Sequence, residues 1–407
     1  MTPPSRVAPT PAHESPTLDL DPVLDSAEIL VCCGAGGVGK TTTAAALALR
    51  AAERGRKVVV LTIDPARRLA QSLGLTELDN VPRRVAGIDA AAGGELLAMM
   101  LDMKRTFDEV VEAHADPARA AQIMANPFYQ ALSSSFAGTQ EYMAMEKLGQ
   151  LREQGRRTGA WDLVVVDTPP TRSALDFLDA PQHLATFLDG RLLRVLLAPA
   201  KAGGRAYAKV LTAGVGVFTG ILTRIIGAQV LRDLSAFIAS LETMFGGFRE
   251  RADATYRLLK APGTAFVVVA APEGDALREA SFFVERLDKE TMPLAGLVLN
   301  RVHRLHASSL RSERSLAAAE ALDERGEHPL AAAVLRLHAE RAAQVARERR
   351  LRSRFTAAHP SVPIAEISAR SGDVHDLAGL RAVGNDLAPA QPAAAEAPVG
   401  AEAEVGA

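Results

Sequence analysis

The sequence predicts a doubly wound α/β fold: a mostly parallel sheet of the P-loop NTPase type, with an inserted α-helical subdomain. Three observations support this prediction. Short apolar runs recur along the chain as continuous stretches, as expected for parallel strands that are buried on both faces. Helical patterns separate the runs. A glycine-rich loop directly follows the first run. The runs cover residues 29–33, 57–63, 162–167, 264–271, 294–299 and 362–367.

Composition indicates a globular protein. The chain has 407 residues, of which 48% are hydrophobic and 23% are charged, so it is long enough to bury a large core. A formal net charge of −2 gives no overall attraction to nucleic acid or to anionic membranes. The two cysteines, Cys32 and Cys33, are neighbours in an apolar run. This spacing excludes a CxxC zinc framework and favours a reducing compartment.

The two ends of the chain are low in complexity and rich in Pro, Ala, Thr, Ser or Glu. We expect disordered tails at residues 1–25 and 388–407, with one folded domain over residues 26–387. Residues 1–18 lack the apolar region of a signal peptide. The longest uncharged apolar stretch, residues 210–223, is shorter than the ~18–20 residues that span a bilayer. A cytoplasmic location is therefore expected.

Helical patterns extend well beyond simple crossovers in two places, about residues 95–158 and 181–260. We assign both to the helical subdomain. A third helical stretch, residues 303–358, is strongly charged. Its arginines Arg347, Arg350 and Arg354 are interspersed with Glu340 and Glu348 and no aromatic residue. This pattern favours a solvated helix with salt bridges over a face that binds nucleic acid.

Residues 34–41 read GAGGVGKT, a full match to the phosphate loop GxxxxGK[ST]. An apolar run precedes the loop and an Ala-rich helical pattern at about 41–54 follows it, which is the strand–loop–helix setting that such a loop requires. The glycines allow backbone N–H groups to converge on phosphate oxygens. The predicted nucleotide contacts come from Gly36, Gly37, Val38, Gly39, Lys40 and Thr41. Lys40 would neutralise the β- and γ-phosphates, and the Thr41 hydroxyl would bind Mg²⁺.

Two aspartates follow predicted parallel strands and are expected at the same edge as this loop. Asp167 closes the run 163–166, the Walker B arrangement, and would hold Mg²⁺ through a water. Asp64 follows the run 57–63 and is placed to orient or deprotonate the attacking water. The alternative for each is a strand-end carboxylate that only caps a loop.

Four segments, in this order, carry a family resemblance: GAGGVGKTT, TIDPARRLAQSLG, FAGTQEYMAMEKL and VVVDTPPTRSALDFL. Together they resemble the ArsA-type ATPases of arsenite transport and tail-anchored-protein targeting, a group with a deviant Walker A loop. The resemblance covers roughly residues 28–385. It implies a phosphate contact from Thr42, a γ-phosphate sensor at Thr171 in switch II beside Asp167, an adenine-reading amide at Asn300, and Pro363 in the segment that flanks the adenine.

The chain departs from that family at one informative position. The family's second lysine, which crosses the dimer to the partner's phosphates, is replaced here by Ala35. The resemblance therefore implies either a homodimer without this trans cation or a heterodimer with a lysine-bearing paralogue. Arg67 or Arg68 could instead supply the charge. The metalloid-binding cysteines of arsenite pumps are also missing, so arsenite is not expected as the ligand.

The segment at residues 206–231 is apolar and Gly-rich, and residues 191–260 carry more Lys and Arg than Asp and Glu. Such a segment could line a groove for a hydrophobic client helix or a small apolar ligand, or contact a membrane peripherally. Packing between helices of the subdomain is the alternative.

The leading functional hypothesis is an enzyme. Hydrolysis of Mg²⁺–ATP would open and close a dimer that carries its client on the helical subdomain. A second hypothesis is a nucleotide-binding regulatory subunit with low turnover, explained by Ala35. A third is a positioning ATPase of the ParA or MinD kind, which would bind DNA or lipid in a salt-dependent way.

Overall fold

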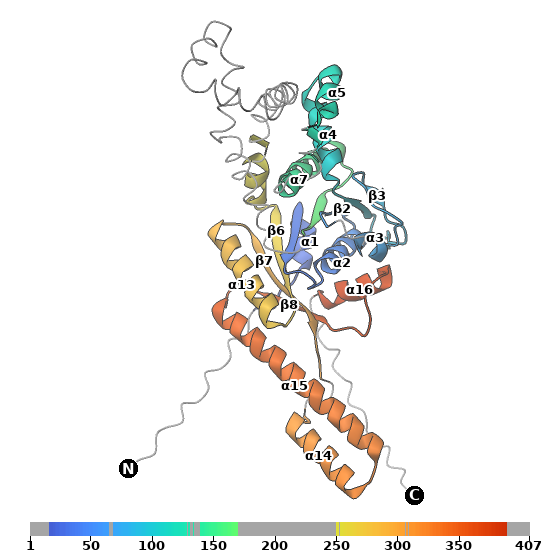
Figure 1. Ribbon diagram of the computed structural model, residues 1–407, viewed down its shortest axis with the longest axis vertical. Coiled ribbons are helices and arrows are strands. Elements are labelled where there is room, and N and C mark those ends of the chain that lie inside the picture. Colours follow the sequence, from blue (N-terminus) through green and yellow to red (C-terminus); the bar gives the residue numbers. More distant parts are fainter. Residues whose placement is uncertain are drawn as a thin grey trace, which may run out of the picture.

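An eight-stranded sheet with helices on both faces forms the centre of the protein (Figure 1). The computed structural model describes residues 16–64, 68–127, 129–130, 133, 139–169, 250–251, 253–305, 307 and 309–388. Its strands are β1 Ile29–Gly34, β2 Lys57–Thr62, β3 Arg83–Arg84, β4 Glu95–Met100, β5 Leu163–Asp167, β6 Thr264–Ala270, β7 Leu294–Val302 and β8 Ile364–Ser368. Their order across the sheet is β3-β4-β2-β5-β1-β6-β7-β8, and only β3 runs antiparallel to its neighbour. The predicted doubly wound α/β class is confirmed.

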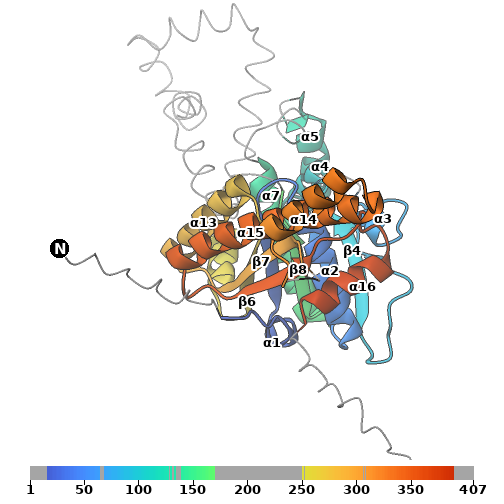
Figure 2. The same cartoon turned by 90° about the horizontal axis from the view of Figure 1, so that it is seen from below.

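Two hydrophobic layers enclose the sheet, because the strands bury residues on both faces. The helices are α1 Asp21–Ser26, α2 Lys40–Glu53, α3 Arg68–Ser72, α4 Met103–His114, α5 Pro117–Ala125, α7 Thr139–Thr158, α13 Gly274–Lys289, α14 Ser312–Arg325, α15 Pro329–Ala358 and α16 Leu377–Asp386. On one face, α1, α2, α3 and α16 pack against the strands. On the other face, α7, α13 and the end of α15 belong to the second hydrophobic layer, in which α4 packs on α7 and α5 packs on α4. Figure 2 shows α13 and α15 on one side of the strands and α2 and α16 on the other.

All six predicted strands are present, with ends shifted by at most two or three residues. The expectation that residues 95–158 are entirely helical is wrong at its start, because residues 95–100 form β4 and pair in parallel with β2. The sequence ELLAMM of β4 consists of good helix formers and runs directly into the pattern of α4. Tertiary pairing with β2 overrides that propensity. The rest of the segment contains α4, α5 and α7, as expected.

The boundary of the predicted amino-terminal tail is also wrong. Thr17 forms a parallel bridge with Ile364, and the Leu18 N–H donates to the Ile364 carbonyl at 3.0 Å. Leu20 and Leu24 are fully buried under α2. The folded domain therefore includes residues 16–25, because the leucines of this segment are buried in the hydrophobic layer that contains α2.

The charged stretch 303–358 is helical only from residue 312 onward, where α14 and α15 form a hairpin that projects from the sheet (Figure 1). The amino-terminal half of α15 exposes Leu330, Val334 and Leu337. Glu348, expected on a solvated face, is buried instead. Its carboxylate accepts from the His303 main-chain N–H at 3.0 Å and contacts His303 Nδ1 at 2.6 Å.

Residues 170–249 lie outside the described residues. They include Thr171, the apolar segment 206–231 and most of the predicted helical insertion 181–260, so these predictions are untested. Within the described part of the chain, no helix combines the length and the apolar character needed to cross a membrane.

Candidate functional site

The glycine-rich loop joins β1 to α2 at the carboxyl edge of the sheet, between the neighbouring strands β5 and β6. Gly36 and Gly37 are exposed at the tip of the loop, so their main-chain groups are accessible to a ligand. Gly39 has φ of +94°, a conformation that residues with a side chain rarely adopt. The loop therefore curls in the way the sequence pattern requires.

Lys40 begins α2 and folds back over the loop. Its side chain is only 6% exposed, and its Nζ donates to the Ala35 carbonyl at 2.7 Å. Burial lowers the pKa of Lys40, and the negative charges of Asp167 and Asp64 are among the effects that oppose this shift. The ammonium group is thus held inside the loop beside two carboxylates.

Asp167 ends β5 and is completely buried. Its Oδ2 accepts hydrogen bonds from the hydroxyls of Thr41 at 2.8 Å and Thr62 at 2.9 Å. Its Oδ1 is buried and accepts no hydrogen bond from the described residues. Burial raises the pKa of Asp167 to about 6, although the two hydroxyl bonds and Lys40 lower it. Lys40 therefore does not fully offset the burial of this carboxylate, and a bound cation would stabilise its charged form further.

The residues present fit a divalent cation such as Mg²⁺. Hard oxygen ligands suit this ion, and it usually keeps several waters when it binds a protein and phosphates. The Thr41 hydroxyl offers one ligand, and the orphaned Oδ1 of Asp167 offers an acceptor for a metal-bound water. The described residues contain no group of three or more His, Cys, Asp or Glu side chains placed to hold a metal on their own. The phosphates would have to complete the coordination.

Asp64 is half-buried two residues after β2. Its main-chain N–H lies 3.3 Å from the Thr62 hydroxyl, which itself donates to Asp167. The negative charge of Asp64 contributes to the raised pKa of Asp167, after the larger effect of burial. Sequence reasoning missed Thr62, which connects the two aspartates. A hydroxyl residue at the end of an otherwise apolar strand, opposite Asp167 in the register, is the signal that could have identified it.

Of the remaining predicted contact residues, Thr42 and Asn300 lie at the loop and Pro363 does not. Thr42 is half-buried in the first turn of α2. Asn300 reaches the loop, because its Nδ2 donates to the Val38 carbonyl at 2.8 Å. Pro363 does not reach it in this structure: it precedes β8, three strands away from β1, and its carbonyl accepts from the Leu297 N–H at 2.9 Å. The adenine contacts of Asn300 and Pro363 stay predictions.

The cysteines lie in β1 as expected. Cys32 and Cys33 are both buried, and the Cys33 thiol is directed at the Val267 carbonyl at 3.7 Å. Burial raises the pKa of Cys33 to about 12 and that of Cys32 well above its usual range. Both therefore stay protonated and act as small apolar residues.

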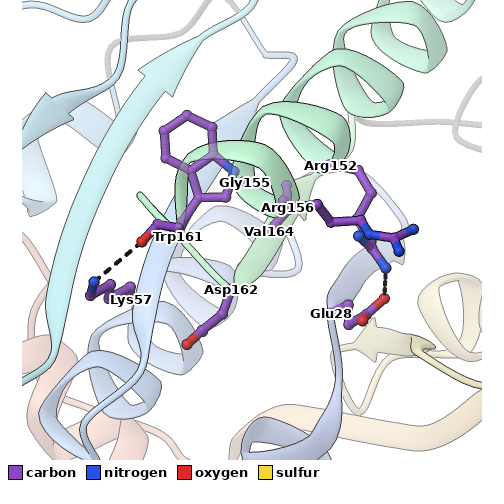
Figure 3. Close-up of a pocket in the computed structure, with 9 residues that line it drawn as sticks. Glu28, Lys57, Arg152, Gly155, Arg156, Trp161, Asp162 and Val164 are labelled. Atoms are coloured by element: carbon purple, nitrogen blue, oxygen red, sulfur yellow. Dashed lines mark hydrogen bonds and ion pairs between the residues drawn. The ribbon is translucent and has the colours of Figure 1, made fainter.

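A separate cavity of about 320 Å³ lies at the opposite, amino edge of the sheet, near the starts of β1, β2 and β5 (Figure 3). Its charged groups are largely paired. Arg152 forms an ion pair with Glu28, and Lys57 donates to the Gly159 carbonyl at 3.2 Å. The Trp161 indole donates to the Leu151 carbonyl at 2.9 Å. None of the predicted site residues lines this cavity, so the candidate site is confined to the carboxyl edge.

The amino-acid sequence is similar to that of known proteins. The sequence profile of a family of anion-transporting ATPases, ArsA_ATPase, matches residues 27–314. ATPase GET3 of Malassezia globosa is 30% identical over 167 residues, 40% of this chain and 46% of the relative. ATPase BagA of Mycobacterium tuberculosis is 27% identical over 170 residues, 41% of this chain and 49% of the relative. ATPase GET3C of Arabidopsis thaliana is 25% identical over 283 residues, 66% of this chain and 65% of the relative. The chain spans about half of the first two and less than two thirds of the third.

Proposed function

This chain belongs to the ArsA-type family of anion-transporting ATPases, and on that basis we propose that it binds Mg²⁺–ATP at the phosphate loop and hydrolyses the γ-phosphate. The observation that carries the proposal is the placement of buried Lys40, half-buried Thr41 and buried Asp167 beside an exposed glycine-rich tip. The Thr41 hydroxyl donates to the Asp167 carboxylate, and the Lys40 charge acts on the same carboxylate. The second oxygen of Asp167 accepts no hydrogen bond from the described residues.

Lys40 and the loop amides supply the positive charge in this proposal. Nζ donates to the Ala35 carbonyl in the structure and would exchange this partner for phosphate oxygens. Charge develops on those oxygens during phosphoryl transfer, and fixed donors stabilise it without reorganisation. The amino end of α2 adds the positive end of its dipole to the same position.

Thr41 and Asp167 would hold Mg²⁺, which supplies charge neutralisation at the β- and γ-phosphates when it is bound. Loading would also remove the cost of the buried carboxylate, because a cation favours its ionised form. Asp64, at the end of β2, is the residue we assign to orient or deprotonate the attacking water. The main-chain N–H of Asp64 contacts the Thr62 hydroxyl, which donates to Asp167, so this contact would fix Asp64 near the metal ligand.

Calorimetry on the purified full chain tests the nucleotide proposal directly. Titration with ATP in the presence of Mg²⁺ should show saturable binding, and removal of Mg²⁺ with EDTA should weaken it. Binding of ATP that is indifferent to Mg²⁺, or no binding at all, would refute the assigned roles of Thr41 and Asp167.

We further propose that the chain works as half of a dimer and that the partner is a lysine-bearing paralogue. The support is the residue at loop position 35. Ala35 is buried, with 7% exposure, and packs in the apolar layer with Val38, so this position presents no cation to a partner. Arg68 is exposed at the start of α3 and could supply the charge instead, whereas Arg67 lies outside the described residues.

A low-turnover regulatory subunit is the second candidate function, and Ala35 favours it. Ala35→Lys should raise the ATP turnover of the isolated chain by at least about tenfold if a missing trans cation limits the rate, since such cations are worth about 10³–10⁵. Steady-state phosphate release measures the effect, with Ala35→Met as a control of similar length without charge. High turnover of the unmodified chain alone would exclude the regulatory role.

We also propose that the chain carries a hydrophobic client. The support is limited to the apolar composition of residues 206–231 and to relatives named as GET3 ATPases. Binding of a synthetic apolar helix to the purified chain, with and without Mg²⁺–ATP, tests this proposal. Equal binding by a variant that lacks residues 206–231 would reject it.

A further inference from the structure

We propose that Asn300 is a positioning residue for the phosphate loop: its side-chain amide holds the Val38–Gly39 peptide in the orientation that presents a main-chain N–H to phosphate. This role differs from reading the adenine base, and it rests on the proposed function only in naming phosphate as the ligand. The geometric part of the inference concerns the ligand-free protein.

The hydrogen-bond partners of Asn300 determine which way its amide faces. Nδ2 donates to the Val38 carbonyl at 2.8 Å, and Oδ1 accepts from the Arg301 N–H at 2.9 Å. A carbonyl can only accept and a main-chain N–H can only donate, so the reversed amide would lose both bonds. One N–H of the side chain remains available for another acceptor.

The peptide bond transmits this contact to the loop. In a planar trans peptide, the carbonyl of one residue and the N–H of the next point in opposite directions. With the Val38 carbonyl held by Asn300, the Gly39 N–H must point away from β7. The Gly39 carbonyl in turn accepts from both the N–H and the hydroxyl of Thr43, at 2.9 and 3.0 Å. Both ends of Gly39 are therefore fixed, one by Asn300 and the other by α2.

Lys40 restrains a peptide at the other end of the loop in the same way. Its Nζ donates to the Ala35 carbonyl, which fixes the following N–H of Gly36 in the same way. The hydrogen bonds made by Lys40 and by Asn300 differ in one respect. Lys40 would leave the Ala35 carbonyl for phosphate, whereas Asn300 can keep its bond to Val38 while a ligand is present.

The backbone around Asn300 is built for this contact. Arg301 adopts φ of +64°, which is uncommon for a residue with a side chain, and the pairing of β7 with β8 shifts between Leu299 and Val302. At this irregularity the Arg301 N–H donates to the Asn300 side chain. Gly39 leaves room for the contact, since a Cβ there would lie 2.2 Å from Asn300 Nδ2.

Amide hydrogen exchange of the ligand-free protein tests the inference without any nucleotide. Asn300→Ala should accelerate exchange in a peptide that covers residues 35–39 by at least about threefold, because the loop loses a restraint on its backbone. Exposed Asn385, near the end of α16, provides the matched control Asn385→Ala, which should leave the loop unchanged. Unchanged exchange of the loop in the Asn300 variant would overturn the proposal.

Binding of inorganic tripolyphosphate with Mg²⁺ separates positioning from base reading, because this probe has no base. If Asn300 positions the loop, Asn300→Ala weakens tripolyphosphate binding by about tenfold, and ATP binding by at least as much. If the residue only contacts adenine, ATP binding weakens and tripolyphosphate binding does not, which contradicts the proposal.

A conservative variant guards against a trivial loss of fold. Asn300→Asp keeps the shape but places an acceptor opposite the Val38 carbonyl, so it should impair tripolyphosphate binding at least as strongly as Asn300→Ala. Retention of full tripolyphosphate affinity by Asn300→Asp would also overturn the inference. An unmodified chain that binds neither ligand would refute the proposed function, and the exchange experiment would still decide the role of Asn300.

Discussion

Each end of helix α2 places a basic residue near an aspartate of another element, and the two aspartates have pKa values shifted in opposite directions. At its amino end, Lys40 and the neighbouring Asp167 are both buried; burial lowers the pKa of Lys40 and raises that of Asp167. At its carboxyl end, Arg50 forms two hydrogen bonds with Asp21, at 2.7 and 2.8 Å. The pKa of Asp21 is lowered there, mainly by its hydrogen bond with Arg50.

The opposite pKa shifts of Asp167 and Asp21 indicate that one end of α2 contributes to ligand binding and the other end to the stability of the fold. A carboxylate with a satisfied partner stabilises the fold on its own. A buried carboxylate with an orphaned oxygen and a raised pKa costs folding free energy, which a bound cation can recover. The amino end of α2 is therefore arranged for a ligand, and the carboxyl end is arranged for the fold. Three substitutions test whether the two ends of α2 differ in this way.

The largest effect is expected from Lys40→Ala. Loss of the buried ammonium removes charge stabilisation from the transferred phosphoryl group, so ATP turnover should fall by at least about 100-fold. Steady-state phosphate release measures it. Arg50→Ala, at the other end of the same helix, is the matched control and should keep turnover within about threefold. Similar losses in both variants would mean that the two ends do not differ in function.

An intermediate effect is expected from Asp167→Asn on stability without metal. The folded-state pKa of about 6 lies above the usual 3.8, so the folded protein binds more protons and loses stability as pH rises from about 4 through 6. The asparagine variant lacks this loss and should gain about 3 kcal/mol relative to wild type by pH 7, at 1.36 kcal/mol per pKa unit.

Urea unfolding in EDTA at pH 4.5 and pH 7 measures the Asp167→Asn effect. Added Mg²⁺–ATP should stabilise the wild type and have little effect on the variant. A variant that is less stable than wild type at pH 7 in EDTA would show that the carboxylate is satisfied within the protein.

The smallest effect is expected from Asp21→Asn, and its pH dependence has the opposite sign. The lowered pKa means that Asp21 contributes stability above pH 4, and this contribution is lost as pH falls through the folded-state pKa. The variant should lose about 1–2 kcal/mol of unfolding free energy at pH 7, and much less at pH 3. Urea titrations at both pH values measure it, and turnover should not change. A loss that is equal at both pH values would assign the effect to packing.

Much of this arrangement could be predicted from sequence. The phosphate loop and the aspartates after two strands are local patterns, because apolar runs and glycines determine the backbone conformation of only the nearest residues. The strand β4 could not be predicted, since ELLAMM favours helix locally and only its pairing with β2 makes it a strand. The burial of Glu348 likewise depends on His303, far away in the sequence.

Within the site, the residue types were predictable and their partners were not. Thr62 joins Asp64 to Asp167 only because β2 and β5 are neighbours in the sheet. Asn300 could be selected as a polar residue after a strand, but its bond to Val38 depends on the irregular end of β7. Contacts between distant strands follow from strand order and register, and neither is determined by local composition.

The parallel bridge between Thr17 and Ile364 has a practical consequence. An outermost strand with free main-chain groups is a template for unwanted pairing between molecules. Residues 16–18 cover that side of β8, with Leu18 and Pro16 each sharing a hydrogen bond with Ile364. A protein shortened at the compositional boundary near residue 25 would expose this edge of β8. Any aggregation of the shortened protein would then reflect the missing segment and not a poorly packed core.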